Sequence, residues 1–163
     1  MEVTIRIYQE QDIADMVRIW NEVLEEGDIF DYDEYLTMDS GRAFFKRQTA
    51  ACVAEDIKGH ICGVYILHPN ARGRCSHIAN ASYAVEKKKR GMHIGTLMIR
   101  DSLERAKVTG FRILQFNAVV ERNLGARHLY EKLGFKKLGV IEDGLLTSDG
   151  EYINICPYYI SLV

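Results

Sequence analysis

The chain has 163 residues, 47% of them hydrophobic, so it can bury a core and is expected to form a single domain over residues 1–163. Its formal net charge of −2 gives no reason to expect a nucleic-acid partner. No apolar run approaches the roughly 20 residues that span a bilayer, and residues 1–6 lack the apolar core of a signal peptide, so no membrane partner is expected. The four cysteines lack the spacing of a zinc site, so no metal is expected and the predicted compartment is the cytoplasm.

The first part of the chain alternates between strand and helix patterns. Residues 3–8 alternate apolar and polar side chains, which is the period of a half-buried strand. Asp12 is expected to cap a helix that ends at Gly27. The apolar stripe expected on that helix consists of Ile13, Met16, Val17, Trp20, Val23 and Leu24. A short helix and a pair of strands are then expected at 40–47, 50–55 and 61–68.

The second part continues the alternation and ends in a strand pair across a turn at 143–150. The expected strand, helix and strand lie at 77–85, 94–108 and 112–120. A further helix, capped by Asn123 and ended by Gly134, precedes the final strands at 135–141 and 152–162. The whole order predicts an α/β (α+β) mixed sheet with helices on both faces, and a right-handed parallel strand–helix–strand unit within it.

The turn Lys89-Arg90-Gly91-Met92-His93-Ile94-Gly95 is the most informative stretch of the sequence. A cationic run precedes it and a helix follows it. The N-terminus of a helix has backbone N–H groups without internal partners and carries partial positive charge, so it attracts phosphate. Glycines let the backbone approach the anion closely. The turn therefore predicts a cradle for a diphosphate.

A dinucleotide-binding oxidoreductase is one alternative for such a cradle. That fold requires three glycines in G-x-G-x-x-G spacing and an acid roughly 20 residues later, at the end of the next strand. Here the glycines are too few, the nearest acid at a strand end is Glu121, and four strands precede the turn. The sequence therefore disfavours this alternative.

Polar side chains interrupt two strands that are expected to be central. Asn80 and Ser82 lie on one, and Gln115 and Asn117 on the other. An amide buried without a partner costs about 1–3 kcal/mol, so these groups either bond one another or bind a ligand. Ligands of open α/β sheets bind beyond the carboxyl ends of the strands, which favours a role in binding.

Two motifs resemble those of the GNAT superfamily of N-acetyltransferases. Arg90-Gly91-Met92-His93-Ile94-Gly95 resembles its pyrophosphate loop for acetyl-CoA. The run from Asn123 through Leu129-Tyr130-Glu131-Lys132-Leu133-Gly134-Phe135 resembles its later motif. The resemblance covers essentially the whole chain and implies the GNAT fold, with a twisted mixed sheet. It also implies an acetyl-CoA-dependent N-acetyltransferase in which the acceptor amine attacks the thioester directly in a ternary complex.

The resemblance also assigns roles to residues. It places the pantetheine arm and thioester carbonyl on the end of the fourth strand, near Ala84 and Val85, and on Asn123, with Ala126 in the same motif. Tyr130 matches the tyrosine that protonates the departing thiolate; its alternative is a core tyrosine. The residues whose backbone would bind the diphosphate are Arg90, Gly91, Met92, His93, Ile94, Gly95 and Thr96.

The general base is less clearly marked. Many family members place an acid on the fourth strand, whereas residues 77–85 contain none. His77 has a suitable intrinsic pKa and is the candidate, although solvent could take the proton instead. His93 stands where the family usually has glycine, so its side chain is expected to point away from the phosphates or to add a polar contact. It is not expected to be an essential base.

A narrower resemblance concerns the acceptor. His77-Ile78-Ala79-Asn80-Ala81 with Phe116-Asn117 is similar to a GNAT branch that includes fungal acetyltransferases of toxic proline analogues such as azetidine-2-carboxylate. In that branch the asparagines matching Asn80 and Asn117 hold the carboxylate or amide of a small amino acid. Phe30 and Tyr32, in the acidic segment after the first helix, are expected to line the acceptor site or to pack onto the core.

The expected partner is therefore a small-molecule amine. Two alternatives stay open: an enzyme that acetylates protein N-termini, and an acyl-CoA-binding module without activity. Acceptor loops transfer poorly within a fold, so the sequence does not choose among acceptors. Homodimers are common in the family, but the sequence identifies no interface.

Overall fold

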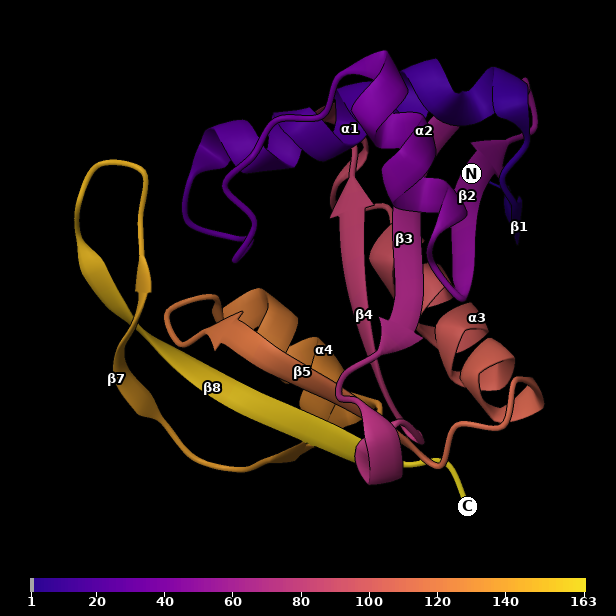
Figure 1. The fold of residues 1–163 in the computed structure, drawn as a ribbon. Coiled ribbons are helices and arrows are strands. Elements are labelled where there is room, and N and C mark those ends of the chain that lie inside the picture. Colours follow the sequence, from indigo (N-terminus) through magenta and orange to yellow (C-terminus); the bar gives the residue numbers. More distant parts are fainter. Residues whose placement is uncertain (1) are drawn as a thin grey trace.

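An eight-stranded mixed sheet forms the centre of the structure, with helices on both of its faces (Figure 1). The computed structural model describes residues 2–163. Met1 lies outside them, although the predicted domain 1–163 and the segment 1–6 both begin with it. The strand order is β1-β2-β3-β4-β5-β8-β6, and β7 also pairs with β8. The predicted mixed α/β fold class is confirmed. None of the helices in residues 2–163 is long and apolar enough to cross a membrane.

The elements follow the predicted order closely. The strands are β1 (Val3–Ile7), β2 (Ala50–Asp56), β3 (Ile61–Pro69), β4 (Ile78–Val85), β5 (Ile113–Val120), β6 (Lys136–Lys137), β7 (Ile141–Leu146) and β8 (Tyr152–Ser161). The α-helices are α1 (Ile13–Glu26), α2 (Met38–Lys46), α3 (Ile94–Val108) and α4 (Leu124–Lys132). Three short 3₁₀ turns are η1 (Glu10–Asp12), η2 (Gly73–Cys75) and η3 (Lys87–Lys89).

The two central strands, β4 and β5, pair only at their beginnings. They are parallel and in register at Ile78 with Ile113 and at Ala79 with Leu114, and no later residues of the two strands pair. Beyond that point they diverge, and Figure 1 shows β5 and β8 turning away from β4. The sheet is therefore split on the side where the carboxyl ends of β4 and β5 lie, and both strands leave an open backbone edge there.

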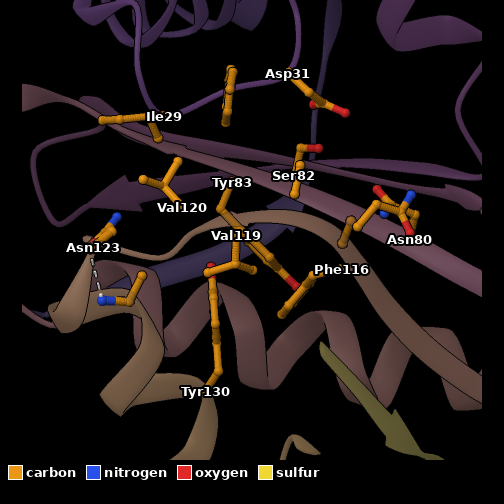
Figure 2. Close-up of a pocket in the computed structure, with 15 residues that line it drawn as sticks. Ile29, Asp31, Asn80, Ser82, Tyr83, Phe116, Val119, Val120, Asn123 and Tyr130 are labelled. Atoms are coloured by element: carbon orange, nitrogen blue, oxygen red, sulfur yellow. Dashed lines mark hydrogen bonds between the residues drawn. The ribbon is translucent and has the colours of Figure 1, made fainter. Parts of the chain in front are cut away.

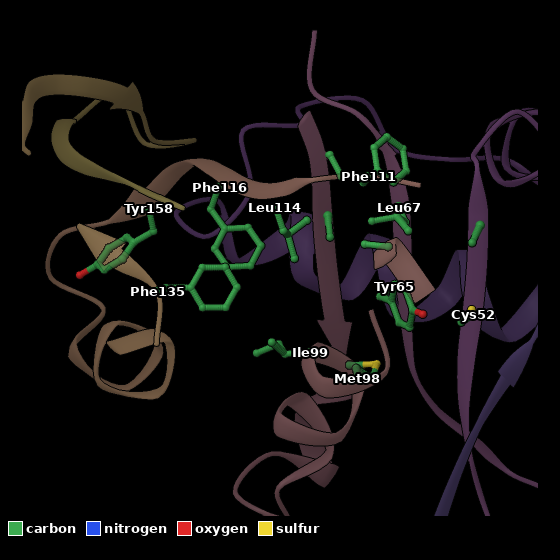
Figure 3. Close-up of a cluster of buried hydrophobic side chains, with 14 of the residues drawn as sticks. Cys52, Tyr65, Leu67, Met98, Ile99, Phe111, Leu114, Phe116, Phe135 and Tyr158 are labelled. Carbon is green, nitrogen blue, oxygen red and sulfur yellow. The ribbon is translucent and has the colours of Figure 1, made fainter. Parts of the chain in front are cut away.

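The core consists of two layers, one on each face of the sheet. Helices α1 and α2 cover one face, where Trp20 and Phe45 are only 1% exposed. On the other face, α3 contributes Met98, which lies beside Tyr65, and Ile99, which lies toward Phe135 (Figure 3). Near β5 this second layer becomes aromatic: the rings of Phe116 and Phe135 stack with centroids 4.8 Å apart. The first layer includes Ala84 of β4, whereas β5 contributes Leu114 and Phe116 to the second layer.

One of the two predicted helix caps is confirmed; the other residue, Asp12, stands at the N-cap position of α1 without a capping hydrogen bond. The side-chain oxygen of Asn123 accepts a hydrogen bond from the Ala126 N–H at 3.2 Å, as an N-cap does. Asp12 makes no such bond to α1, because η1 precedes that helix directly. Its carboxylate instead accepts the Gln9 N–H and pairs with Arg6 at 2.7 Å. Arg6 therefore lowers the pKa of Asp12.

The predicted strand 135–141 and the turn 143–150 are both misplaced. The structure has only a two-residue β6 there, and β7 runs through Asp143, which the sequence assigned to the turn. Asp143 has a positive φ of 52° and gives its N–H to the side chain of Asn154 at 3.1 Å. Asp and Gly are typical of turns, but here they form an irregular strand because β8 supplies the hydrogen-bond partner.

Candidate active site

The open edge of β4 presents backbone groups to the gap. Antiparallel strands alternate between residues that bond the partner strand and residues whose N–H and C=O point away. The Asn70 N–H bonds the Ile78 carbonyl at 2.7 Å, and the Glu86 N–H bonds the Cys62 carbonyl at 3.0 Å. Even-numbered residues of β4 therefore bond β3, whereas odd-numbered residues face β5.

This alternation corrects one predicted position. Ala84 lies opposite Val64 of β3, is only 1% exposed, and directs its backbone groups toward β3. It cannot offer an N–H to the gap. The residues that can are Tyr83 and Val85, because β5 has already diverged from β4 at their level. Sequence reasoning found the right end of the strand but could not fix the phase of the pairing.

A cavity of about 660 Å³ lies between this edge and the N-terminus of α3. The N–H groups of the first helical residues, Ile94, Gly95 and Thr96, have no acceptor within the helix. A Cβ added at Gly91 or Gly95 would meet nothing within 4 Å, so the space above the turn is open. The predicted cofactor residues that line this cavity are Val85, Arg90, Gly91, His93, Ile94, Gly95, Thr96, Asn123 and Ala126.

The arrangement fits acetyl-CoA. Open space above two glycines and a helix N-terminus matches the size and the charge of a diphosphate. The free backbone edge of β4 matches an amide-bearing arm such as pantetheine. Met92, in contrast, is 46% exposed and does not line the cavity, so its side chain takes no part in this fit.

A second cavity, of about 110 Å³, lies on the other side of the gap, toward the segment after α1. Figure 2 shows Asp31 and Ser82 on its upper side, Asn80 at one end and Tyr130 reaching in from below. Of the predicted acceptor residues, Phe30, Asn80 and Asn117 line it. The cavity is small, polar at one end and closed by aromatic and aliphatic side chains at the other.

An amide network joins β4 to β5 where their backbone pairing stops. Asn80 Nδ2 donates to the carbonyl of Gln115 at 3.0 Å. Asn117 Nδ2 donates to Asn70 Oδ1 at 2.6 Å, and its own oxygen accepts from Gln115 Nε2 at 3.0 Å. Asn80 and Asn117 are thus held by neighbours and still line the cavity, whereas Gln115 and Asn70 support them from outside it. Asn70 follows β3 and has no signal of its own in the sequence.

Of the two alternatives left open for Tyr32, the structure has the second: Tyr32 packs onto the core and does not line the acceptor cavity. Its ring packs against Trp20, with centroids 5.3 Å apart, and against Phe44. It lines a separate cavity of about 240 Å³ beside α2. Burial raises the pKa of Tyr32, and a hydrogen bond with Ser82 opposes that shift. The residue is therefore a core tyrosine that supports the cavity wall from behind.

Tyr130 lines both cavities. Its ring packs on Phe116 at a centroid distance of 4.7 Å, and its hydroxyl has no hydrogen-bond partner within residues 2–163. Burial raises the pKa of Tyr130 to about 12, so the phenol is neutral and can donate a proton at physiological pH. The two cavities meet at a wall made of Ile29, Tyr83, Asn123, Ala126 and Tyr130.

Comparison with known proteins identifies the family. The sequence profile of the Acetyltransferase (GNAT) family matches residues 13–135, which is most of the chain. The chain belongs to the GNAT acetyltransferase family. It is thus an N-acetyltransferase, as the two motifs predicted, and the GNAT fold is confirmed.

Individual relatives agree with this assignment. The chain is 28% identical to the N-acetyltransferase aca1 of Schizosaccharomyces pombe over 92% of this chain and 80% of that protein. A GCN5-related N-acetyltransferase from Kribbella flavida has 28% identity and a TM-score of 0.89, with 98% and 97% of the two chains covered. A phosphinothricin acetyltransferase from Sinorhizobium meliloti, solved with acetyl-CoA, shares the fold at 18% identity and a TM-score of 0.91, with 99% and 89% covered.

His77 lies outside both cavities of this acetyltransferase. It precedes β4, at the end of the strand away from the cavities, is exposed, and lines neither of them. Three residues of strand, or roughly 10 Å, separate it from Asn80, which does line the acceptor cavity. His77 lines neither cavity, and its role as a base stays a prediction. The carboxylate that does line the acceptor cavity is Asp31.

Arg90 of this acetyltransferase is held by α1. Its guanidinium makes two hydrogen bonds to the carboxylate of Glu26, one of 2.9 Å from Nη1, and its Nε donates to the Val85 carbonyl at 3.3 Å. The bond to Glu26 raises the pKa of Arg90. Because Glu26 already neutralises the side chain, Arg90 fixes the turn to α1 and leaves the backbone to face the cavity.

His93 adopts a conformation that glycine normally supplies. Its φ is 62°, in the left-handed region, and it occupies the N-cap position of α3. A side chain there costs roughly 1–2 kcal/mol relative to a right-handed conformation. His93 is exposed and lines the cofactor cavity. The family's preference for glycine at this position therefore has a backbone reason.

Proposed function

We propose that this N-acetyltransferase moves an acetyl group from acetyl-CoA to a primary or secondary amine of a small molecule, by direct attack in a ternary complex. The observation that carries the proposal is the shared wall of the two cavities. One side of that wall fits the coenzyme, the other side has room for an amine, and Tyr130 belongs to both. Both substrates can thus be present at once, with no need for an acetylated enzyme.

The residues divide the chemistry between them. Acetyl-CoA supplies an activated acetyl group as a thioester. The free N–H of Tyr83 or Val85 on the open edge of β4 polarises the thioester carbonyl and stabilises the oxyanion as the new C–N bond forms. As the C–S bond breaks, the Tyr130 hydroxyl donates its hydrogen to the leaving sulfur. Asp31 attracts the acceptor ammonium, which loses one proton to solvent or to that carboxylate before it attacks. The nitrogen loses a second proton after the attack, and a proton from solvent restores the Tyr130 hydroxyl.

The size and charge of the acceptor cavity support a small amine. At about 110 Å³ it is far smaller than the roughly 300–1,000 Å³ of pockets for drug-sized ligands. Its amides, Asn80 and Asn117, are suited to a carboxylate or amide group. We therefore include amino acids and proline analogues among the acceptors.

A screen tests this proposal directly. Release of free CoA thiol from acetyl-CoA is measured with small amines, amino acids, proline analogues and short peptides with free N-termini. We expect turnover with a small amine, and a loss of that turnover in Tyr130→Phe but not in Tyr152→Phe, which alters an exposed tyrosine of β8. Turnover confined to the peptides would contradict the small-molecule proposal and favour acetylation of protein N-termini.

A further inference from the structure

Helix α4 carries the proposed acid, Tyr130, yet little of this helix is buried. None of the residues in Leu124–Lys132 is buried, whereas α1, α2 and α3 each bury several side chains. Most of the stability of a helix in a protein comes from packing of its apolar face. Other interactions must therefore help to fix the position of α4 against the sheet.

A single phenol hydroxyl of β8 joins two consecutive turns of α4. Tyr158 is fully buried, and its hydroxyl donates to Glu131 Oε1 at 2.8 Å. The same oxygen accepts a hydrogen bond from Arg127 Nε at 3.2 Å. Figure 3 shows this hydroxyl pointing away from Phe116 and the rest of the buried cluster. Arg127 and Glu131 are four residues apart, so their side chains lie on one face of the helix. The hydroxyl therefore holds α4 at two points.

Arg127 extends this contact to the neighbouring strand. Its Nη1 donates to the carbonyl of Glu121, the residue directly after β5, at 2.9 Å. One guanidinium thus ties α4 both to β8 and to the end of β5. Because its donors are fixed in one plane, two bonds from this group restrict the orientation of the helix as well as its distance from the sheet.

Tyr130 lies between the two points that Tyr158 holds. The centroid of its ring is 5.9 Å from that of Tyr158 and 4.7 Å from that of Phe116, which is the residue of β5 opposite Tyr158. Packed aromatic rings tolerate several distances and angles, whereas hydrogen bonds weaken steeply when they are bent. The ring contacts therefore bury Tyr130, and the bonds of Tyr158 set the rotation of the helix from which its side chain extends.

We propose that Tyr158 is a positioning residue that, through Arg127 and Glu131, holds the hydroxyl of Tyr130 at the wall between the two cavities. This inference rests on the proposed function, in which Tyr130 donates a hydrogen to the leaving sulfur. A proton donor has to lie within hydrogen-bond distance of the atom that it protonates, and a displacement of about 1 Å can cost about 10²-fold in rate. Tyr158 lines neither cavity, so it acts only through α4.

Removal of the hydroxyl tests this role without unfolding the protein. Tyr158→Phe keeps the buried ring, and Arg127 and Glu131 are at least partly exposed, so no charge is left buried without a partner. With an amine found in the screen, this variant should lower kcat about tenfold. The acceptor KM and the affinity for acetyl-CoA should stay unchanged, because both cavities keep all of their lining residues. Tyr152→Phe, at the exposed tyrosine of the same strand, is the matched control and should keep the wild-type kcat.

Glu131 offers a conservative variant that separates the hydrogen bond from the bulk of the side chain. Glu131→Gln keeps an oxygen that can accept from the phenol, so it should retain most of the wild-type kcat. Glu131→Leu loses that acceptor and should lower kcat in the same direction as Tyr158→Phe. Equal losses in the two Glu131 variants would overturn the hydrogen bond as the cause.

The double variant Tyr130→Phe/Tyr158→Phe gives the decisive readout. If Tyr158 acts through Tyr130, the double variant should be no slower than Tyr130→Phe alone. A slow Tyr130→Phe enzyme that Tyr158→Phe slows again by the same factor would overturn this inference and leave the acid role of Tyr130 intact. Full kcat in Tyr158→Phe beside a slow Tyr130→Phe would do the same. Full kcat in Tyr130→Phe would instead overturn the acid role, and this inference with it.

Discussion

The two sides of the gap between β4 and β5 are built in different ways. The cofactor side uses the main chain: the open edge of β4 and the N-terminus of α3, which are adjacent in sequence. The acceptor side uses side chains from separate segments, with Asp31 after α1, Asn80 on β4 and Asn117 on β5. A backbone site tolerates changes in sequence but not in volume. A side-chain site changes its ligand with a few substitutions. The cofactor is therefore the constant half of this enzyme and the acceptor the variable half.

The largest effect should come from adding volume to the backbone side. Gly95→Leu fills the open space above the turn, where the added Cβ meets no protein atom, so the chain should still fold. We expect acetyl-CoA binding to weaken by about a hundredfold or more, since the diphosphate can no longer reach the helix N–H groups. Calorimetric titration measures this.

Gly95→Ala is the graded control for that substitution. It should weaken binding less and leave the unfolding temperature unchanged or higher, because alanine favours the helix. Full affinity in the leucine variant would mean that the coenzyme does not use this turn.

The next effect concerns the wall between the two sides. Tyr130→Phe should lower kcat by about 10²-fold or more while the affinity for acetyl-CoA stays the same, since only the hydrogen-bond donor is lost. Stability should change little, because the hydroxyl has no partner among residues 2–163. The measurement is steady-state kinetics beside a binding titration.

The pKa of Tyr130 adds a pH criterion. Burial raises it to about 12, above the usual value near 10, so the phenol stays protonated as the pH rises through 10. The wild-type rate should therefore show no loss from this group below about pH 11. A fall in kcat near pH 10 that Tyr130→Phe abolishes would contradict the assigned environment.

A smaller effect is expected from the acceptor side. Asn80→Ala should raise the acceptor KM about tenfold and leave acetyl-CoA binding intact, because the amide lines only the acceptor cavity. Asn70→Ala is the matched variant: it removes the bond to Asn117 without altering a lining residue. Equal KM changes in both variants would show that Asn80 acts only through the network.

The smallest effect concerns the strained residue of the cofactor turn. His93→Gly should raise the free energy of unfolding by about 0.5–1 kcal/mol. Glycine removes the cost of the left-handed conformation, and its greater freedom in the unfolded chain offsets part of that gain. Met92→Gly, next to it, offers no such relief and should not stabilise the protein. Denaturant titration distinguishes them. A destabilised His93→Gly would indicate that the imidazole makes a contact of its own.

The same comparison explains what could be predicted from the sequence. The turn at 89–95 and the cap at Asn123 involve residues within a few positions of each other, so local patterns disclosed them. Whether Ala84 or Tyr83 points its N–H into the gap depends on how β4 pairs with β3. The local sequence of β4 does not reveal that pairing. That His77 and Tyr32 do not line the acceptor cavity depends on where β5 diverges from β4 and on where Trp20 packs. Asn70 reaches the site through the fold alone, whereas Asp31 lies in the acidic segment that the sequence already marked as part of the acceptor site.

The most direct test of the central claim is an NMR titration of the backbone amides with acetyl-CoA. We predict that the largest shifts occur at Gly91 and at 94–96, with a further shift at Tyr83 or Val85 on the open edge of β4. Saturating coenzyme that moves other amides and leaves these unchanged would contradict the account.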